Sequence, residues 1–195
     1  MIPRVVPFDD PEVPRLLLEA LETGLSLIFP TDTVYGVGGN PWDERVLDAV
    51  RRLKGRDPRS PFTLHLPDTE SIGRFARPST AARHVIDRLL PGPFTFLLPA
   101  SPDAPPSATK DGIVGVRVPD HPFFGQILAR LGRPIFGTSV NRSGEPPAHD
   151  IDGIIDRFGA VDLVFVGPIG ATESTILDLT VAPPRLVRGM RPDGL

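Results

Sequence analysis

Short apolar runs alternate with amphipathic segments along most of the chain. A helix is expected between Asp9-Asp10-Pro11 and Gly24, because apolar residues recur there at helical spacing. The next run, Leu25–Phe29, is uniformly apolar and is closed by Pro30, which indicates a buried strand. We expect segment 31–40 to be a loop, because glycines and hydroxyl residues dominate it.

The same alternation continues towards the C-terminus. Further helices are expected over 43–53, 79–90 (with Ser79 as its N-cap), 122–131 and 150–158. Further strands are expected over 62–66, 94–98, 113–118, 134–138, 162–166, 175–179 and 185–187. Strands that alternate with helices indicate an α/β or α+β domain with a central twisted sheet. The length of 195 residues predicts a single domain over 1–195.

The composition narrows the chemistry before any motif is considered. There is no cysteine, which excludes disulfides, thiolate catalysis and cysteine-ligated zinc. The net charge of -3 argues against a surface that coats nucleic acid. No two of the four histidines have a metal-binding spacing, so no metal site is expected. The chain lacks the apolar core of a signal peptide and any run near the roughly 20 residues of a membrane span, so a cytoplasmic location without membrane contact is expected.

Two cations, Lys54 and Arg56, follow the helix expected over 43–53. Two of the 21 lysine and arginine residues are lysines, Lys54 and Lys110. The compact ammonium of lysine can bind phosphate as a point charge. Cations at the end of a helix are also stabilised by the partial negative charge of the helix dipole there. The pattern alone therefore leaves an anion pocket and a helix-end interaction both open.

Two loops that follow apolar strands carry clustered polar side chains. The first offers the hydroxyls of Thr31, Thr33 and Tyr35, at a position where α/β sheets usually bind ligands. The second contains Ser139 and Asn141, which point the same way if the segment is extended. Structural turns explain either loop equally well on spacing alone.

Four further residues are candidates for contact with a ligand. Arg117 lies in an otherwise apolar strand, where a buried guanidinium needs an anionic partner, either an internal carboxylate or a substrate carboxylate. His65 lies in a strand close to the Lys54 loop. Ser174 and Arg188 are weak signals when each is taken alone.

Several motifs in order resemble the YrdC-type threonylcarbamoyladenylate synthases. They are Pro-Thr-Asp-Thr-Val-Tyr-Gly, Lys-Gly-Arg, Pro-Gly-Pro-Phe-Thr, Val-Gly-Val-Arg-Val-Pro, Ser-Val-Asn-Arg-Ser-Gly, Ser-Thr-Ile-Leu-Asp-Leu and Leu-Val-Arg. The resemblance runs from about Leu25 to Arg188 and implies the short, single-domain form, a YrdC-like α/β fold with a twisted mixed β-sheet flanked by helices. It also implies a nucleotidyltransferase that makes threonylcarbamoyl-AMP and pyrophosphate from L-threonine, bicarbonate and ATP. The product would serve N6-threonylcarbamoyladenosine modification of tRNA.

The resemblance also implies roles for individual residues. Lys54 and Arg56 are expected to neutralise the triphosphate and are the catalytic candidates. The expected threonine contacts are Thr31, His65, Arg117, Ser139 and Ser174. The expected ATP contacts are Lys54, Arg56, Asn141 and Arg188. Mg²⁺ would arrive with ATP and be held by phosphates and water, so no protein cage is expected. The implied partners are tRNA or a downstream transferase complex.

The chain differs from the usual sequence motifs of the family at several positions. Ser139-Val140-Asn141 replaces the commoner Ser-Ala-Asn, and Ser60-Pro61-Phe62-Thr63 replaces Lys-Pro-Leu-Ile, which removes one cation. The Phe-Thr wording is similar to that of the YciO-like paralogues. The alternatives are therefore a YciO-like paralogue or an RNA-binding module of the same fold. The retained Lys54, Arg56, Ser139 and Asn141 favour the synthase.

Overall fold

The structure, a computed structural model, describes residues 2–192, in which strands from distant parts of the sequence form a mixed β-sheet. Hydrogen-bonded neighbours follow the order β1-β9-β2-β3-β8-β4-β7-β5-β10-β11, and β6 pairs with β7. The strands are β1 (Arg4–Pro7), β2 (Leu27–Phe29), β3 (Gly36–Gly39), β4 (Thr63–His65), β5 (Phe94–Pro99), β6 (Thr109–Lys110), β7 (Ile113–Arg117), β8 (Ile135–Ser139), β9 (Leu163–Val166), β10 (Thr175–Asp178) and β11 (Arg185–Arg188). The helical segments are α1 (Val13–Thr23), α2 (Glu44–Lys54), α3 (Ile72–Phe75), α4 (Thr80–Leu89), η1 (Pro106–Ala108), η2 (Phe123–Leu128), α5 (Ala129–Leu131) and α6 (Ile151–Phe158).

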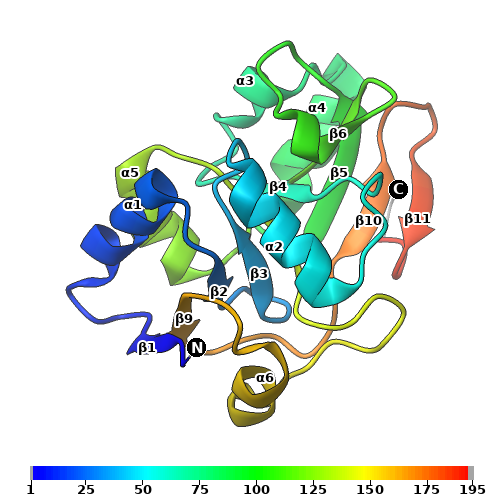
Figure 1. Ribbon diagram of the computed structural model, residues 1–195. Helices are drawn as coiled ribbons and strands as arrows, with labels where there is room; N and C mark the ends of the chain where they lie inside the picture. Colours follow the sequence, from blue (N-terminus) through cyan, green and yellow to red (C-terminus); the bar gives the residue numbers. More distant parts are fainter. Residues whose placement is uncertain (1, 193–195) are drawn as a thin grey trace.

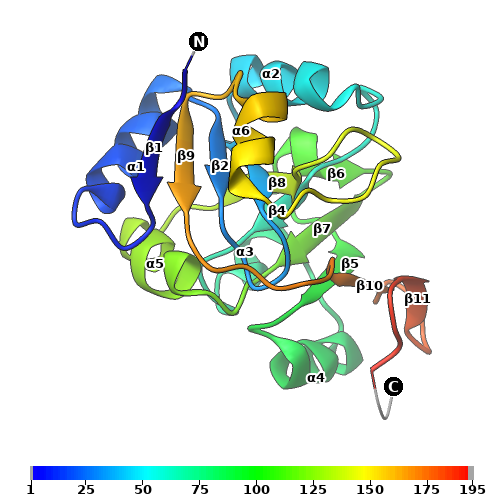
Figure 2. The ribbon, with the colours of Figure 1, turned by 90° about the horizontal axis from the view of Figure 1, so that it is seen from below.

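Helices cover both faces of the sheet (Figures 1 and 2). Successive side chains of a strand point to opposite faces, so β2 contributes to two separate cores. Leu27 and Phe29 pack under α1 and η2, whereas Ile28 packs under α2 and α6. A third cluster lies where α3 and α4 cover β5 and β7. The expected mixed α/β architecture is confirmed, and most expected elements lie within two residues of the observed ones.

The predicted loop 31–40 is wrong in its second half. Gly36–Gly39 forms β3, which pairs with β2 on one side and β8 on the other. Glycine has low strand propensity, so the sequence favoured a loop. The packing explains the glycines: a Cβ on Gly38 would lie 1.8 Å from the backbone oxygen of Phe136, and one on Gly36 would lie 2.5 Å from the Phe29 ring. The strand is therefore built by close packing that admits only hydrogen at these positions.

Two predicted helices differ in detail. The helix expected from Asp9-Asp10-Pro11 begins at Val13, because the Asp10 side chain accepts from the backbone of Glu12 at 2.8 Å in a turn before it. The helix expected over 122–131 has two parts. It is a π-helix over η2 and an α-helix over α5. Strands β1 and β6 and the short segments α3 and η1 were not predicted. All are brief and depend on pairing or packing with distant residues.

Candidate functional site

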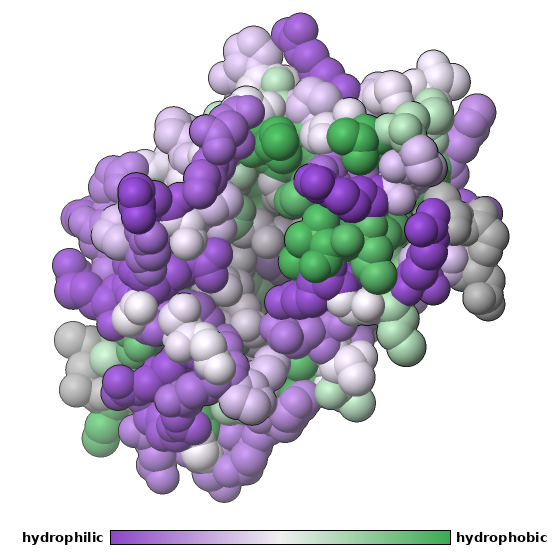
Figure 3. Space-filling model, turned by 90° about the vertical axis from the view of Figure 1, so that its right-hand side faces the viewer, coloured by the Kyte–Doolittle hydropathy of each residue, from purple (hydrophilic) through white to green (hydrophobic). Residues whose placement is uncertain are grey.

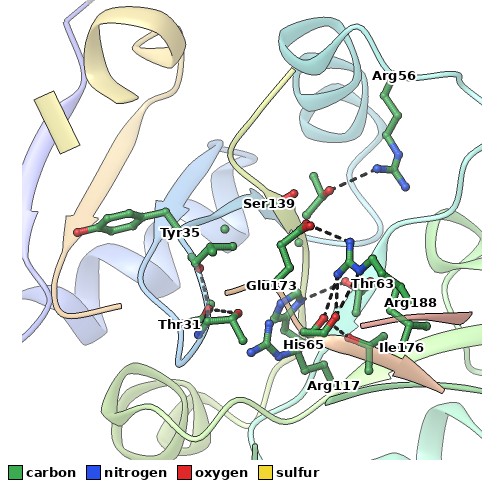
Figure 4. A pocket seen from close by; sticks show the side chains of 17 residues that line it. Thr31, Tyr35, Arg56, Thr63, His65, Arg117, Ser139, Glu173, Ile176 and Arg188 are labelled. Carbon is green, nitrogen blue, oxygen red and sulfur yellow. Dashed lines mark hydrogen bonds and ion pairs between the residues drawn. The ribbon is translucent and has the colours of Figure 1, made fainter. Parts of the chain in front are cut away.

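A cavity of about 150 Å³ opens where loops and strand ends from across the sheet converge (Figure 4). Its walls come from the loop between β2 and β3, the segment after α2, strands β4, β5, β7, β8 and β10, and the end of β11. The cavity is lined by these residues singled out in the sequence: Thr31, Thr33, Tyr35, Arg56, His65, Arg117, Ser139, Ser174 and Arg188. Three arginines therefore meet hydroxyl groups and one imidazole in the same space.

The buried strand arginine has an internal partner. Arg117 is 5% exposed at the end of β7, and a nitrogen of its guanidinium donates to an oxygen of Asp32 in a salt bridge. Burial lowers the pKa of Arg117, and the charge of Asp32 opposes that shift. Nε of Arg117 and Oδ2 of Asp32 are buried without a hydrogen-bond partner. The pair therefore keeps donor and acceptor capacity for a third group.

Arg56 is held at the opposite wall by its own loop. Its guanidinium donates to the Pro61 backbone oxygen at 2.8 Å and to the Thr138 hydroxyl at 3.3 Å. It also lies 5.3 Å from the centre of the Phe62 ring. These contacts fix the direction of a planar cation, and a fixed guanidinium is well suited to bind phosphate or carboxylate.

Lys54 lies behind the cavity wall and is not among the lining residues. Its ammonium donates to the Ser139 backbone oxygen, to the Asn141 backbone oxygen at 2.9 Å and to Asn141 Oδ1 at 2.7 Å. The Lys54 backbone oxygen also accepts from Ser143 at 3.0 Å. Burial and then the charge of Arg56 lower the pKa of Lys54 to about 8. In this arrangement Lys54 holds the loop that carries Ser139 and Asn141.

Asn141 and Ser139 are oriented by the same network. Ser139 Oγ donates to Asn141 Oδ1 at 2.7 Å. The chain bends at residues 140–141 instead of staying extended, so the two side chains meet through this bond. The Asn141 amide donates to the Glu145 backbone oxygen at 2.6 Å. Ser139 lines the cavity, whereas Asn141 lies behind it with Lys54.

The hydroxyls of the β2–β3 loop bond either within the loop or to a distant backbone oxygen. Thr31 Oγ1 donates to the Val34 backbone oxygen at 2.7 Å and lies 2.9 Å from Thr33 Oγ1. The Tyr35 hydroxyl donates to the Gly167 backbone oxygen at 2.8 Å, and Figure 4 shows its ring directed away from the cavity cluster. Thr31 and Thr33 thus line the cavity, and the Tyr35 hydroxyl does not face it.

His65 is a neutral group on the cavity wall. It is 5% exposed and its ring lies 5.7 Å from the ring centres of Phe29 and Phe124. Burial, followed by the charge of Arg117, lowers its pKa to about 3. Nδ1 lies 3.3 Å from the Thr63 backbone oxygen. A neutral imidazole can accept or donate a hydrogen bond to a substrate without adding charge.

The C-terminal wall joins Ser174 and Arg188. Ser174 Oγ lies 3.0 Å from Thr95 Oγ1, and Arg188 donates to the Ser174 backbone oxygen at 3.0 Å and to Glu173 at 3.0 Å. Glu173 is the acidic residue among the cavity lining, and sequence reasoning missed it. Thr95 and the carboxylate of Asp32 were also missed as site residues. Their roles depend on partners far away in the chain, and no local pattern marks them.

An apolar groove of about 380 Å³ adjoins the cavity and shares Arg56, Thr63, Thr95 and Ile176 with it. Leu97, Ile113, Ile176 and Val187 contribute its apolar surface. Figure 3 shows apolar side chains gathered beside a hollow on the face that carries β10 and β11. The combined site thus offers charge at one end and apolar contact at the other.

Residues 2–192 hold neither a cluster of metal-ligating side chains nor a membrane-spanning helix. No group of three or more histidine, aspartate or glutamate side chains within this range is arranged to hold a metal ion. None of the helices within the same range is long and apolar enough to cross a bilayer.

Comparison with known proteins supports one family. The family described as "Telomere recombination" (Sua5_yciO_yrdC) matches residues 19–189. A threonylcarbamoyl-AMP synthase of Bacillus subtilis is 33% identical over 191 residues, which cover 92% of this chain and 54% of the relative. One of Chromohalobacter salexigens is 34% identical, over 82% of this chain and 89% of the relative. The chain spans about half the length of the first curated relatives it matches, from Bacillus subtilis and Pyrococcus abyssi.

Solved structures give the same answer. P. abyssi Sua5 complexed with L-threonine aligns with a TM-score of 0.84 at 31% identity, over 96% of this chain and 57% of that one. E. coli YciO aligns with a TM-score of 0.84 at 27% identity, over 95% and 93%. The family match covers most of the chain, and the matched structures share its fold throughout that region. The chain therefore belongs to the Sua5/YciO/YrdC family.

Proposed function

We propose that this chain is an L-threonylcarbamoyladenylate synthase, which joins L-threonine, bicarbonate and ATP and releases pyrophosphate. The observation that carries the proposal is the convergence of Arg56, Arg117 and Arg188 on a cavity that also holds a neutral histidine and serine and threonine hydroxyls. This donor set suits an amino acid and a triphosphate at the same time. Relatives named threonylcarbamoyl-AMP synthase support the choice of substrates.

The amino acid end is assigned to the floor of the cavity. Arg117 uses one terminal nitrogen for Asp32, and its Nε has no partner, so it retains a donor for a substrate carboxylate. His65 and Ser174 line the same cavity as Arg117, and they are the proposed contacts for the threonine hydroxyl and amine. Thr31 shapes this end through its own loop bonds, and Ser139 faces it from β8.

The nucleotide end is assigned to the opening of the cavity. Arg56 and Arg188 supply positive charge for the phosphates, and Mg²⁺ travels with ATP on its phosphate oxygens and water. The base and ribose follow into the adjoining apolar groove, where Ile176 borders both spaces. In this proposal the amino acid lies on the cavity floor, the phosphates lie beside Arg56 and Arg188, and the base lies in the apolar groove.

The chemistry asks for positioning and charge neutralisation more than for covalent catalysis. The threonine amine attacks the carbon of CO₂ and releases a proton to water, or attacks bicarbonate with loss of a water molecule; either route forms an N-carboxylate. An oxygen of that carboxylate then attacks the α-phosphorus, the bond to the bridging oxygen breaks, and pyrophosphate leaves. Cations fixed in advance around the developing negative charge stabilise such a transition state. The proposed consumer of the mixed anhydride is a downstream transferase complex that acts on tRNA.

Lys54 and Asn141 take a supporting place in this scheme. The ammonium of Lys54 adds positive charge behind the phosphate end and holds the backbone on which Ser139 is mounted. A direct bond from Lys54 to the triphosphate, as the family resemblance implies, requires the ammonium to leave one of its oxygen partners. Asn141 reaches ATP in the same way only if its bond to Lys54 opens.

A YciO-like activity is the second candidate, because E. coli YciO matches the fold as well as Sua5 does. Exchange of pyrophosphate into ATP across a panel of amino acids separates the two. The synthase assignment predicts a signal with threonine and bicarbonate, and a paralogue predicts another acceptor or none.

The direct test is release of pyrophosphate from ATP with bicarbonate and labelled threonine. Arg188→Ala should lower threonine-dependent release roughly 100-fold, as removal of a charge-stabilising donor does. Arg185→Ala is the matched control, since Arg185 lies on the same strand but pairs with Asp178 away from the cavity. Release that does not depend on threonine would contradict the proposal.

A further inference from the structure

A second cavity lies at the other end of the β3–β8 pair from the candidate site. The register of that pair joins Gly36 to Ser139 at the site end and Gly39 to Phe136 at the far end. The second cavity, of about 350 Å³, lies beyond the far end. Its lining includes Leu21, Asn40, Trp42, Arg74, Arg133 and Pro134. Its volume falls within the roughly 300–1,000 Å³ of small-molecule sites.

An indole ring is held at the edge of this second cavity. Trp42 is the single tryptophan of the chain and is 50% exposed. Its backbone donates to Asn40 Oδ1 at 3.0 Å, and the Asn40 amide donates to the Leu21 backbone oxygen at 2.8 Å. The ring of Phe75 lies 6.2 Å from the Trp42 ring. The backbone of Trp42 is therefore anchored, and its ring contacts Phe75 while half of the residue stays exposed to solvent.

Two guanidinium groups accompany the indole. Arg74 lies 5.2 Å from the centre of the Phe75 ring, the same ring that Trp42 contacts, and lines the second cavity together with Trp42. Arg133 pairs with Glu22 at 3.6 Å, but both side chains are about half exposed (49% and 54%), and such surface pairs contribute little free energy. Both arginines therefore remain able to bind an anion. An exposed aromatic ring beside arginines is the arrangement that binds unpaired bases and their phosphates.

We propose that this second cavity binds a nucleotide, with its base stacked on Trp42 and its phosphate between Arg74 and Arg133. The Asn40 amide is held by its bonds to the Leu21 backbone oxygen and the Trp42 backbone N–H. Every base offers a face for stacking, so binding is expected to tolerate different bases. The nucleotide is either free in solution or an unpaired residue of an RNA strand, and the same contacts serve both. This site is separate from the proposed ATP site and does not depend on the synthase activity.

Intrinsic fluorescence tests the proposal, because Trp42 is the only tryptophan and sits in the cavity. AMP, UMP and a short single-stranded RNA are titrated into the protein at low salt. Saturable quenching by the mononucleotides supports a site open to free nucleotides, and quenching by RNA alone supports recognition within a strand. Absence of quenching by all three overturns the proposal.

Variants identify where the signal arises. Arg74→Ala combined with Arg133→Ala should weaken binding about tenfold or more, since charge-assisted contacts to phosphate are lost. Arg77→Ala is the matched control, because Arg77 is an exposed neighbour of α3 that does not line the cavity. Arg188→Ala in the candidate active site should leave the quenching unchanged. Equal affinity in the double variant and the unmodified protein, or loss of quenching in Arg188→Ala, overturns the assignment.

Discussion

The ammonium of Lys54 lies 2.7 Å from Oδ1 of Asn141, and the same ammonium also bonds backbone oxygens of Ser139 and Asn141. The three N–H groups of a lysine thus all meet oxygen acceptors of one loop. Removing the ammonium leaves those oxygens without their donor, so we expect Lys54 to affect stability as well as the proposed synthase activity.

Lys54→Met keeps the length of the side chain and removes its charge. We expect a loss of about 1–3 kcal/mol in the free energy of unfolding, because buried acceptors lose their partner, together with a large fall in turnover. Urea denaturation and pyrophosphate release measure the two effects. Lys110→Met is the control for stability, because Lys110 is exposed and its loss should change the free energy of unfolding little. A Lys54→Met protein of unchanged stability would show that the loop does not depend on this contact.

Asp32 and Arg117 should behave as a buried ion pair. Asp32→Asn leaves the Arg117 cation, 5% exposed, without its counter-charge, and we expect a loss of about 3–5 kcal/mol in the free energy of unfolding. Asp57→Asn removes a carboxylate from the exposed pair with Arg59 and should cost less than about 1 kcal/mol. Denaturant titration of both variants makes the comparison. Equal effects of the two substitutions would mean that burial does not govern the Asp32–Arg117 contact.

His65 should make the folded state sensitive to acid. Its pKa falls from 6.5 to about 3 on folding, so below pH 6.5 the unfolded chain binds a proton that the folded chain does not. The contribution of neutral His65 to the free energy of unfolding is complete above pH 6.5 and is lost as the pH falls towards 3. Between pH 7 and pH 5 the unmodified protein should lose about 2 kcal/mol more than His65→Gln, from about 1.4 kcal/mol per pH unit below 6.5. Urea titrations at both pH values measure this difference, and parallel pH profiles would contradict it.

Gly38→Ala should prevent close pairing of β3 with β8. The added Cβ would lie 1.8 Å from the Phe136 backbone oxygen, and backbone cannot yield as a flexible side chain can. We expect failure to fold, or a loss above about 4 kcal/mol. Gly73→Ala in α3 is the control, since no atom lies within 4 Å of its added Cβ and alanine favours a helix by roughly 0.5–1 kcal/mol. Thermal unfolding compares the two, and a stable Gly38→Ala protein would contradict this account of β3.

Short sequence patterns predicted those helix ends, helices and strands that depend on neighbouring residues in the chain. Ser79, for instance, was expected as an N-cap, and its hydroxyl accepts from Ala82 at 3.2 Å as predicted. Strand β3 could not be predicted, because Gly36 and Gly38 are explained by Phe29 and Phe136 in neighbouring strands, which are distant or unpaired in the sequence pattern. The same holds for Tyr35, whose hydroxyl was offered to a ligand but bonds Gly167, 132 residues away.

Hydrophobic periodicity, prolines and clustered polar motifs act over a few neighbouring residues, so they were enough to indicate the mixed α/β class and the residue types of the candidate site. Which of those residues meet depends on the folded chain. It gave Arg117 an internal carboxylate 85 residues away, drew Lys54 back to Ser139 and Asn141, and brought Glu173 beside Arg188 at the cavity. Pairings of this kind depend on strand order and burial, which arise only when distant segments pack together.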